Sequence, residues 1–129
     1  MAKESIKLAG QSGLAIAASV EGANDGMPVI LAHGGGQTHR AWKRVSTLLA
    51  SHGFHAIALD LRGHGNSEWA KDGAYDIADF AGDLIAIAAR LERKPALIGA
   101  SLGGLAGIMA EGHLAPGSFA SLTLVDITP

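Results

Sequence analysis

Apolar residues fall into two alternating patterns from Pro28 onward. Short, mostly apolar runs predict strands over residues 28–32, 54–59, 96–98 and 122–125. The run at 28–32 is apolar throughout, which is typical of a strand buried on both faces of a sheet. Between these runs, apolar residues recur at helical spacing, which predicts helices over residues 38–51, 76–93 and 102–114. This alternation predicts a parallel sheet with right-handed crossovers and helices on both faces.

The first part of the chain shows a different pattern. Residues 6–8 and 14–20 are short apolar segments separated by a stretch that runs from Gly10 to Gly13, which favours a β-hairpin. The predicted fold class is therefore α/β, with a mostly parallel sheet that begins with an antiparallel hairpin.

Composition narrows the class of protein. The 129 residues suit one domain, and 48% of them are hydrophobic, which excludes disorder. A net charge of -2 gives no electrostatic footprint for nucleic acid or an acidic membrane, and only 17% of residues are charged, which suggests that some surfaces are covered. The absence of cysteine excludes disulfides, thiolate zinc sites and a Cys nucleophile. No apolar stretch has the length of a signal peptide core or a membrane span, so we expect a cytoplasmic protein.

The most informative motif lies between the third parallel strand and its helix. Residues 99–103 read Gly-Ala-Ser-Leu-Gly, which is the pattern G-x-S-x-G. A serine at a sharp strand-to-helix turn adopts a strained backbone that exposes its hydroxyl, and the glycines remove side chains that would collide there. The pattern predicts Ser101 as a nucleophile, with the amide of Leu102 donating to a developing oxyanion.

A second glycine-rich segment follows the strand over residues 28–32. It reads His33-Gly-Gly-Gly36, and glycines let the backbone aim an amide at a bound carbonyl. Gly35 is the first choice for a second oxyanion donor and Gly36 the next. We expect His33 to be structural rather than the catalytic base, because it belongs to this turn.

The sequence does not support a dinucleotide site or a metal site. Neither glycine-rich segment has the G-x-G-x-x-G spacing of a dinucleotide site, and the six histidines form no pair on one helical face. We therefore expect no cofactor and no metal. Residues 60–65, Asp-Leu-Arg-Gly-His-Gly, predict a structural turn held by Asp60, Arg62 and backbone groups.

Taken together, four segments resemble the α/β-hydrolase fold superfamily. These are the strand with residues 33–36, and residues 60–67, 99–104 and 124–129, in that order. The chain looks most like the group of esterases, non-haem haloperoxidases and epoxide-hydrolase-like proteins. The resemblance implies Ser101 as nucleophile, the Leu102 and Gly35 amides as the oxyanion hole, and Asp126 as a candidate triad acid. Epoxide hydrolases of this fold use an Asp nucleophile, so Ser101 argues against that reaction.

The triad of this superfamily runs Ser, then an acid, then His. After Ser101 the only histidine is His113, which the helical pattern places in a buried position. The family's histidine follows the last strand of eight, so we expect residues 1–129 to be the N-terminal portion of a single α/β-hydrolase domain. This portion holds the first six strands, with the C-terminal part and the base outside it.

Three functions remain open. The first is a serine hydrolase acting on a carboxylic ester or similar acyl substrate. The second is a non-catalytic fragment that associates through its open sheet edge. The third is a cofactor-free perhydrolase or haloperoxidase on the same fold. The expected partners are a small acyl substrate and either a complementing C-terminal polypeptide or an edge-mediated oligomer.

Overall fold

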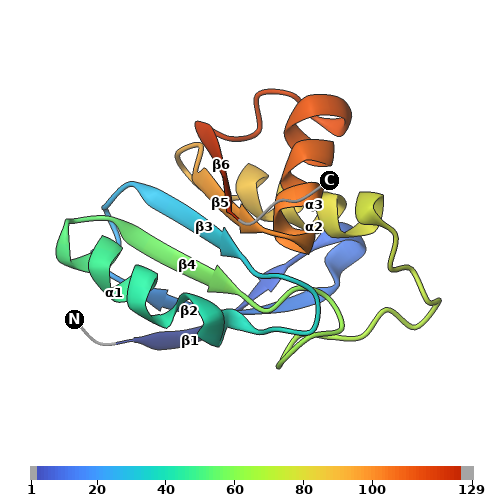
Figure 1. The fold of residues 1–129 in the computed structure, drawn as a ribbon, viewed down its shortest axis with the longest axis horizontal. Helices are drawn as coiled ribbons and strands as arrows, with labels where there is room; N and C mark the ends of the chain where they lie inside the picture. The colour runs from blue at the N-terminus through green and yellow to red at the C-terminus, as the bar shows by residue number, and fades with distance from the viewer. Residues whose placement is uncertain (1–2, 126–129) are drawn as a thin grey trace.

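The computed structural model describes residues 3–125, which form a six-stranded sheet with helices against it (Figure 1). The strands are β1 (Glu4–Ala9), β2 (Ala15–Glu21), β3 (Pro28–Ala32), β4 (His55–Leu59), β5 (Ala96–Ala100) and β6 (Ser121–Val125). The α-helices are α1 (Lys43–Ser51), α2 (Ile77–Ala89) and α3 (Leu102–Met109). Short helical turns are η1 (Gln11–Gly13), η2 (His39–Trp42) and η3 (Ala110–Leu114), the last of them π-helical.

The strand order is β1-β2-β4-β3-β5-β6. β2 pairs antiparallel with both β1 and β4, whereas β4, β3, β5 and β6 run parallel to one another. This confirms the mostly parallel sheet with an antiparallel N-terminal hairpin. Because parallel strands place their carboxyl ends at one edge, the segments that follow β3, β4 and β5 meet there.

Helices cover both faces of the sheet, as the sequence predicts. In β3, Val29 and Leu31 face the side that carries α1 and pack with Trp42. The alternate residues of β3 belong to the larger core on the other side, where α2 and α3 lie. Successive side chains of β3 therefore point into the cores on opposite faces of the sheet. Because both faces are buried, the strand is apolar at every position.

Helix boundaries differ from the predicted ones at three places. The first predicted helix divides into the 3-10 turn η2 and α1, after Thr38, whose hydroxyl accepts from the amide of Arg40 at 3.3 Å. The second ends at Ala89, before the predicted 93. The third passes into π-helical geometry over η3, so the α-helical period that predicted a buried His113 is not kept and His113 is exposed.

No helix within residues 3–125 has the length and apolar character that crossing a membrane requires.

Candidate active site

Ser101 is the single residue that links β5 to α3. Its backbone has φ 50° and ψ −113°, a left-handed conformation that few residues other than glycine adopt, and its side chain is exposed. β5 ends one residue before it and α3 begins one residue after it. The turn therefore presents the hydroxyl at the edge where the parallel strands end, as the motif predicts.

The flanking glycines are required by contact distances. A Cβ on Gly99 would lie 2.7 Å from the carbonyl carbon and oxygen of Gly103. A Cβ on Gly103 would lie 2.2 Å from the carbonyl oxygen of Ala32, at the end of β3. Gly103 also donates its amide to the carbonyl of His33 at 3.1 Å. The first turn of α3 thus packs directly against the end of β3, at a distance that only glycine permits.

The loop 33–36 lies beside this turn. A Cβ on Gly34 would lie 3.3 Å from the Cβ of Ser101, and one on Gly35 would lie 3.9 Å from Cδ2 of Leu102. The structure therefore brings together Ser101, Leu102 and Gly35, which sequence reasoning assigned to one site from segments about 65 residues apart, by the convergence of strand ends.

The four amides nearest the hydroxyl differ in what they bind. Gly34 donates to Oε1 of Gln37 at 3.0 Å, and Gly36 donates to Nε2 of His64 at 3.0 Å. Within residues 3–125, the amides of Gly35 and Leu102 donate to no protein acceptor. Leu102 is the first residue of α3, where an amide has no intrahelical partner. Two open donors therefore flank Ser101, and Gly36, the second choice from sequence, is already engaged.

Two histidines fix the loop that carries these donors. His33 is fully buried, with Nδ1 2.7 Å from the carbonyl of Gly34 and Nε2 accepting from the amide of Leu61 at 3.0 Å. His64 uses Nδ1 at 2.9 Å from the carbonyl of Arg62, and its Nε2 accepts from Gly36. The two rings lie 4.9 Å apart between centroids. Burial lowers the pKa of His33 below its ordinary value, so the ring is neutral and holds the loop rather than moving protons.

The turn after β4 is saturated with hydrogen bonds. The carboxylate of Asp60 is buried and accepts from the amides of His39 at 2.7 Å and Asn66 at 3.0 Å, and from the ring of His39 at 2.8 Å. Burial alone would raise the pKa of Asp60, but these donors together lower it. A Cβ on Gly65 would lie 2.4 Å from this carboxylate, so the turn closes tightly around it. These contacts fit the structural role expected for residues 60–65.

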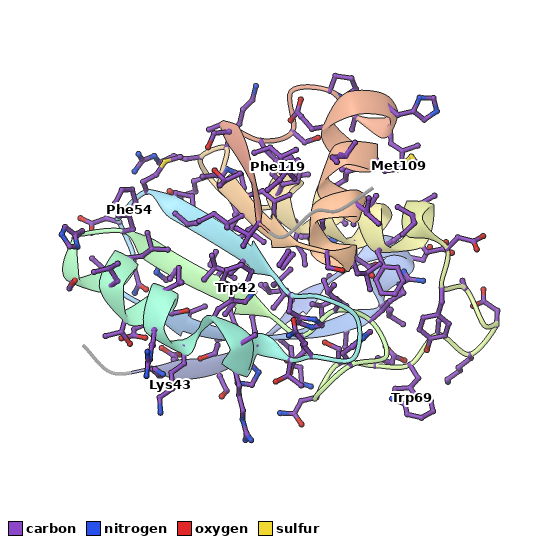
Figure 2. The ribbon with its side chains drawn as sticks, in the orientation of Figure 1. Trp42, Lys43, Phe54, Trp69, Met109 and Phe119 are labelled. Atoms are coloured by element: carbon purple, nitrogen blue, oxygen red, sulfur yellow. The ribbon has the colours of Figure 1, made fainter. Side chains whose placement is uncertain are left out.

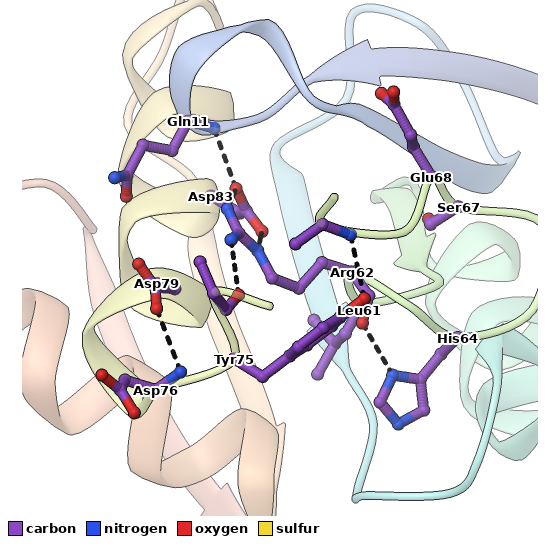
Figure 3. Close-up of polar contacts among 12 residues, drawn as sticks. Gln11, Leu61, Arg62, His64, Ser67, Glu68, Tyr75, Asp76, Asp79 and Asp83 are labelled. Carbon is purple, nitrogen blue, oxygen red and sulfur yellow. Dashed lines mark hydrogen bonds and ion pairs between the residues drawn. The ribbon is translucent and has the colours of Figure 1, made fainter. Parts of the chain in front are cut away.

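A buried ion pair ties this turn to α2 (Figure 3). Nε and Nη2 of Arg62 donate to the two carboxylate oxygens of Asp83, each at 2.7 Å. Arg62 also donates to the carbonyl of Ala74 at 2.8 Å, and Asp83 accepts from the amide of Gln11 at 2.8 Å. Asp83 was not singled out from sequence. The sequence feature that could have identified it is its position: a carboxylate next to Leu84, within the apolar face of a predicted helix.

No base for Ser101 is found in the described part of the chain. Between residues 3 and 125, no hydrogen bond joins the Ser101 hydroxyl to an imidazole. His113 lies exposed in η3. Asp126, the candidate acid, lies outside the described residues. In the same range, no three His, Cys, Asp or Glu side chains are arranged to hold a metal ion.

Comparison with known proteins agrees with this geometry. A family model described as "Alpha/beta hydrolase family" matches residues 29–128. An esterase of Mycobacterium tuberculosis is 39% identical over 104 residues, which cover 78% of this chain and 33% of the esterase. A non-heme chloroperoxidase of Streptomyces lividans is 34% identical over 109 residues, which cover 84% of this chain and 39% of that protein. The crystal structure of epoxide hydrolase A from Mycobacterium thermoresistibile superimposes with a TM-score of 0.88 at 26% identity, covering 99% of this chain and 40% of that one.

The chain thus spans between 33% and 40% of the length of these relatives. The matched region contains the serine turn, the glycine-rich loop and the parallel strands that carry them. The chain belongs to the alpha/beta hydrolase family.

Proposed function

We propose that the chain carries the nucleophile and oxyanion hole of a serine hydrolase that acts on a carboxylic ester or similar acyl substrate. The observation that carries this proposal is the exposed hydroxyl of Ser101 beside two open amide donors, those of Leu102 and Gly35. Preorganised amides at this position stabilise the negative charge that develops on a substrate carbonyl after nucleophilic attack. The esterase relative supports an ester as the substrate class.

In the proposed reaction, the Ser101 oxygen attacks the carbonyl carbon and the carbonyl oxygen becomes an oxyanion held by Leu102 and Gly35. An external imidazole takes the serine proton and returns it to the departing alcohol, and water then releases the acyl group by the same steps. His33 and His64 are excluded as this imidazole because both nitrogens of each ring are engaged with backbone groups.

We propose that a complementing segment supplies the base and packs on β6. Among the described strands, β6 pairs only with β5, so its other edge offers free backbone groups. Leu124 on β6 is 42% exposed, and Leu105 and Ile108 of the adjacent α3 are 45% and 42% exposed. Apolar side chains beside an unpaired strand edge fit a surface that further strands and helices would cover.

Intact-mass spectrometry with a fluorophosphonate probe tests the proposal. We expect one adduct, located by peptide mapping at Ser101, and loss of both the adduct and ester turnover in Ser101→Ala. Replacing an armed serine lowers turnover by about a millionfold when the rest of the site is complete. Ser12→Ala is the matched control, because Ser12 is also exposed and has a positive φ of 56° but no flanking oxyanion loop.

The outcomes separate the hydrolase from the non-catalytic fragment. An adduct in the presence of a second polypeptide supports a hydrolase completed by that polypeptide. Ester turnover that is the same in Ser101→Ala as in the unchanged protein overturns the proposal. A folded, unlabelled chain with no partner favours the non-catalytic fragment.

A cofactor-free perhydrolase is the second candidate, favoured by the chloroperoxidase relative. The same nucleophile would form an acyl-enzyme that hydrogen peroxide, rather than water, attacks to give a peracid. Peroxide-dependent bromination of a dye, compared with ester hydrolysis by the same sample, distinguishes the two reactions.

A further inference from the structure

Two hollows lie on the α1 side of the sheet, between the β1–β2 hairpin and the η2–α1 segment. The first is about 440 Å³, and its walls include Ser5, Lys7 and Ala17. The second is about 390 Å³, and its walls include Lys3 and Lys43. Ser19 and His39 line both hollows, so the two form one groove, which we call the basic groove.

The walls of the basic groove are rich in cations. Lys3 and Lys7 come from the hairpin side, and Arg40 and Lys43 come from the helical side. Lys43 extends from the start of α1 at the lower left of Figure 2, where β1 also lies. The protein as a whole has a net charge of -2, so this concentration of positive charge is local. Such a surface raises the local concentration of anions.

The negative charge that lines the groove is buried and hydrogen-bonded to the protein. Among residues 3–125, one carboxylate lines either hollow: Asp60, which lies in the first and is 1% exposed. Its oxygens accept from the backbone and ring of His39 and from the amide of Asn66. Lys7 donates to the carbonyl of Asn66 at 2.7 Å, which holds one cation in place and leaves its other protons for a ligand.

Neutral donors complete the lining. Ser46 is 6% exposed yet lines the second hollow, and within residues 3–125 its hydroxyl has no hydrogen-bond partner. The ring of His39 donates from Nδ1 to Asp60, so in the neutral ring Nε2 is an acceptor and not a donor. The floor is made of small residues, Ala17, Ser19 and Ala58, which leave room for a ligand.

We propose that the basic groove is a binding site for a phosphate-bearing ligand, separate from the serine site. Several cations with a hydroxyl donor suit a group with several oxygens and more than one negative charge, which describes phosphate better than a single carboxylate. Two hollows in line accommodate either a second phosphate or the organic part of a phosphate ester. Ser101 lines neither hollow, so the proposal stands apart from the proposed hydrolase activity.

Amide chemical-shift titration of the purified protein tests the site, with inorganic phosphate, pyrophosphate and phenyl phosphate as probes at constant ionic strength. We expect saturable shifts at Ser19, Arg40 and Lys43. Tighter binding of pyrophosphate would identify a polyphosphate ligand, and tighter binding of phenyl phosphate would identify an ester. The double substitution Arg40→Gln with Lys43→Gln should weaken binding by at least about tenfold, since charge-assisted hydrogen bonds to phosphate are lost.

The matched control removes the same charge elsewhere. Arg44 and Arg90 are exposed and line neither hollow, so Arg44→Gln with Arg90→Gln should change affinity by less than about twofold. Lys43→Arg, which keeps the charge, should retain binding. Dispersed amide spectra of each variant show that it is folded. Shifts that do not saturate with any probe, or equal weakening by the two double substitutions, would overturn the proposal.

Discussion

The loop after β3 and the turn after β4 lie at the same edge of the sheet but are built in opposite ways. The turn at residues 60–67 engages nearly every polar group it carries, through Asp60, Arg62 and their partners. The loop at residues 33–36, with the serine turn beside it, leaves two amides without protein acceptors. A site that must stabilise transient charge needs donors that are open yet rigidly placed, and here the saturated turn supplies the rigidity.

The contact between the two regions is made by histidines. The ring of His33, in the loop, accepts from the amide of Leu61 in the turn. The ring of His64, in the turn, accepts from the amide of Gly36 in the loop. Each region therefore holds one backbone amide of the other through an imidazole. The comparison predicts that loss of the buried pairs in the saturated turn costs stability, whereas loss of the two open amides costs activity with little loss of stability.

Breaking the ion pair under the saturated turn should have the largest effect on stability. Arg62 is 5% exposed and Asp83 is 2% exposed, so Arg62→Met leaves an unpaired carboxylate in the core. We expect the free energy of unfolding, measured by urea denaturation, to fall by about 3–5 kcal/mol. Replacing both partners, Arg62→Met with Asp83→Leu, should recover part of this loss.

The exposed Arg90→Met is the control for loss of a surface cation. If Arg62→Met and Arg90→Met were equally stable, the pair would contribute nothing to the rigidity of the turn.

Crowding the serine turn should have the next largest effect. In Gly103→Ala the new methyl group meets the carbonyl oxygen of Ala32, and α3 must move away from β3. We expect a loss of about 1–3 kcal/mol in the free energy of unfolding. Gly112→Ala, where nothing lies within 4 Å of the added atom, should be neutral or stabilising by up to about 1 kcal/mol. A Gly103→Ala protein as stable as Gly112→Ala would show that the close approach is not needed.

Cutting one of the histidine links should have a smaller and more local effect. His64→Ala removes the acceptor for the Gly36 amide, which lies in an exposed part of the loop. We expect a loss of about 1 kcal/mol, because water can replace the ring in its exposed bond to Gly36 and in its partly buried bond to the carbonyl of Arg62. Hydrogen exchange of the Gly36 amide should become faster.

His52→Ala is the matched control, since His52 contacts only its own helix end through the carbonyl of Leu48. Unchanged exchange at Gly36 in His64→Ala would mean that the loop is held by other contacts.

The smallest expected effect is a pH dependence that comes from His33. Burial lowers the pKa of His33 from its ordinary 6.5, so below pH 6.5 the unfolded chain binds a proton that the folded chain does not. This contribution to stability is complete above pH 6.5 and is lost as pH falls toward the lowered folded-state pKa. Urea midpoints between about pH 5 and 7.5 should therefore rise with pH, and His33→Gln should flatten that rise. The exposed His113→Gln should leave the slope unchanged, and an equal slope in His33→Gln would contradict the assignment.

Sequence reasoning recovers the parts of this molecule that depend on local pattern. The four parallel strands, three helices and the serine turn follow from apolar period and glycine spacing, because buried strands and sharp turns restrict which residues fit. Of these strands, β6 is mostly exposed in the structure. The position of β2 next to β4 does not follow, since strand order depends on packing between distant segments. The pairing of Arg62 with Asp83 is missed for the same reason: each residue has an ordinary local context, and only the fold joins them.

Within the candidate site, sequence places the hydroxyl and both open donors but not what holds them. Sequence ranks Gly35 before Gly36 as the second donor, but the contact that distinguishes them comes from His64, in another loop, which accepts from the amide of Gly36. The predicted burial of His113 is wrong because π-helical geometry replaces the α-helical period at that point.

The backbone of Ser101 has one further consequence for the chemistry at this edge. The close contacts that require glycine at positions 99 and 103 are with Gly103, Gly104 and Ala32 and do not involve the serine hydroxyl. Another short side chain at position 101 would therefore lie in the same turn, beside the same two amides. A side chain at either flanking glycine, by contrast, would meet backbone atoms at 2.7 Å or closer.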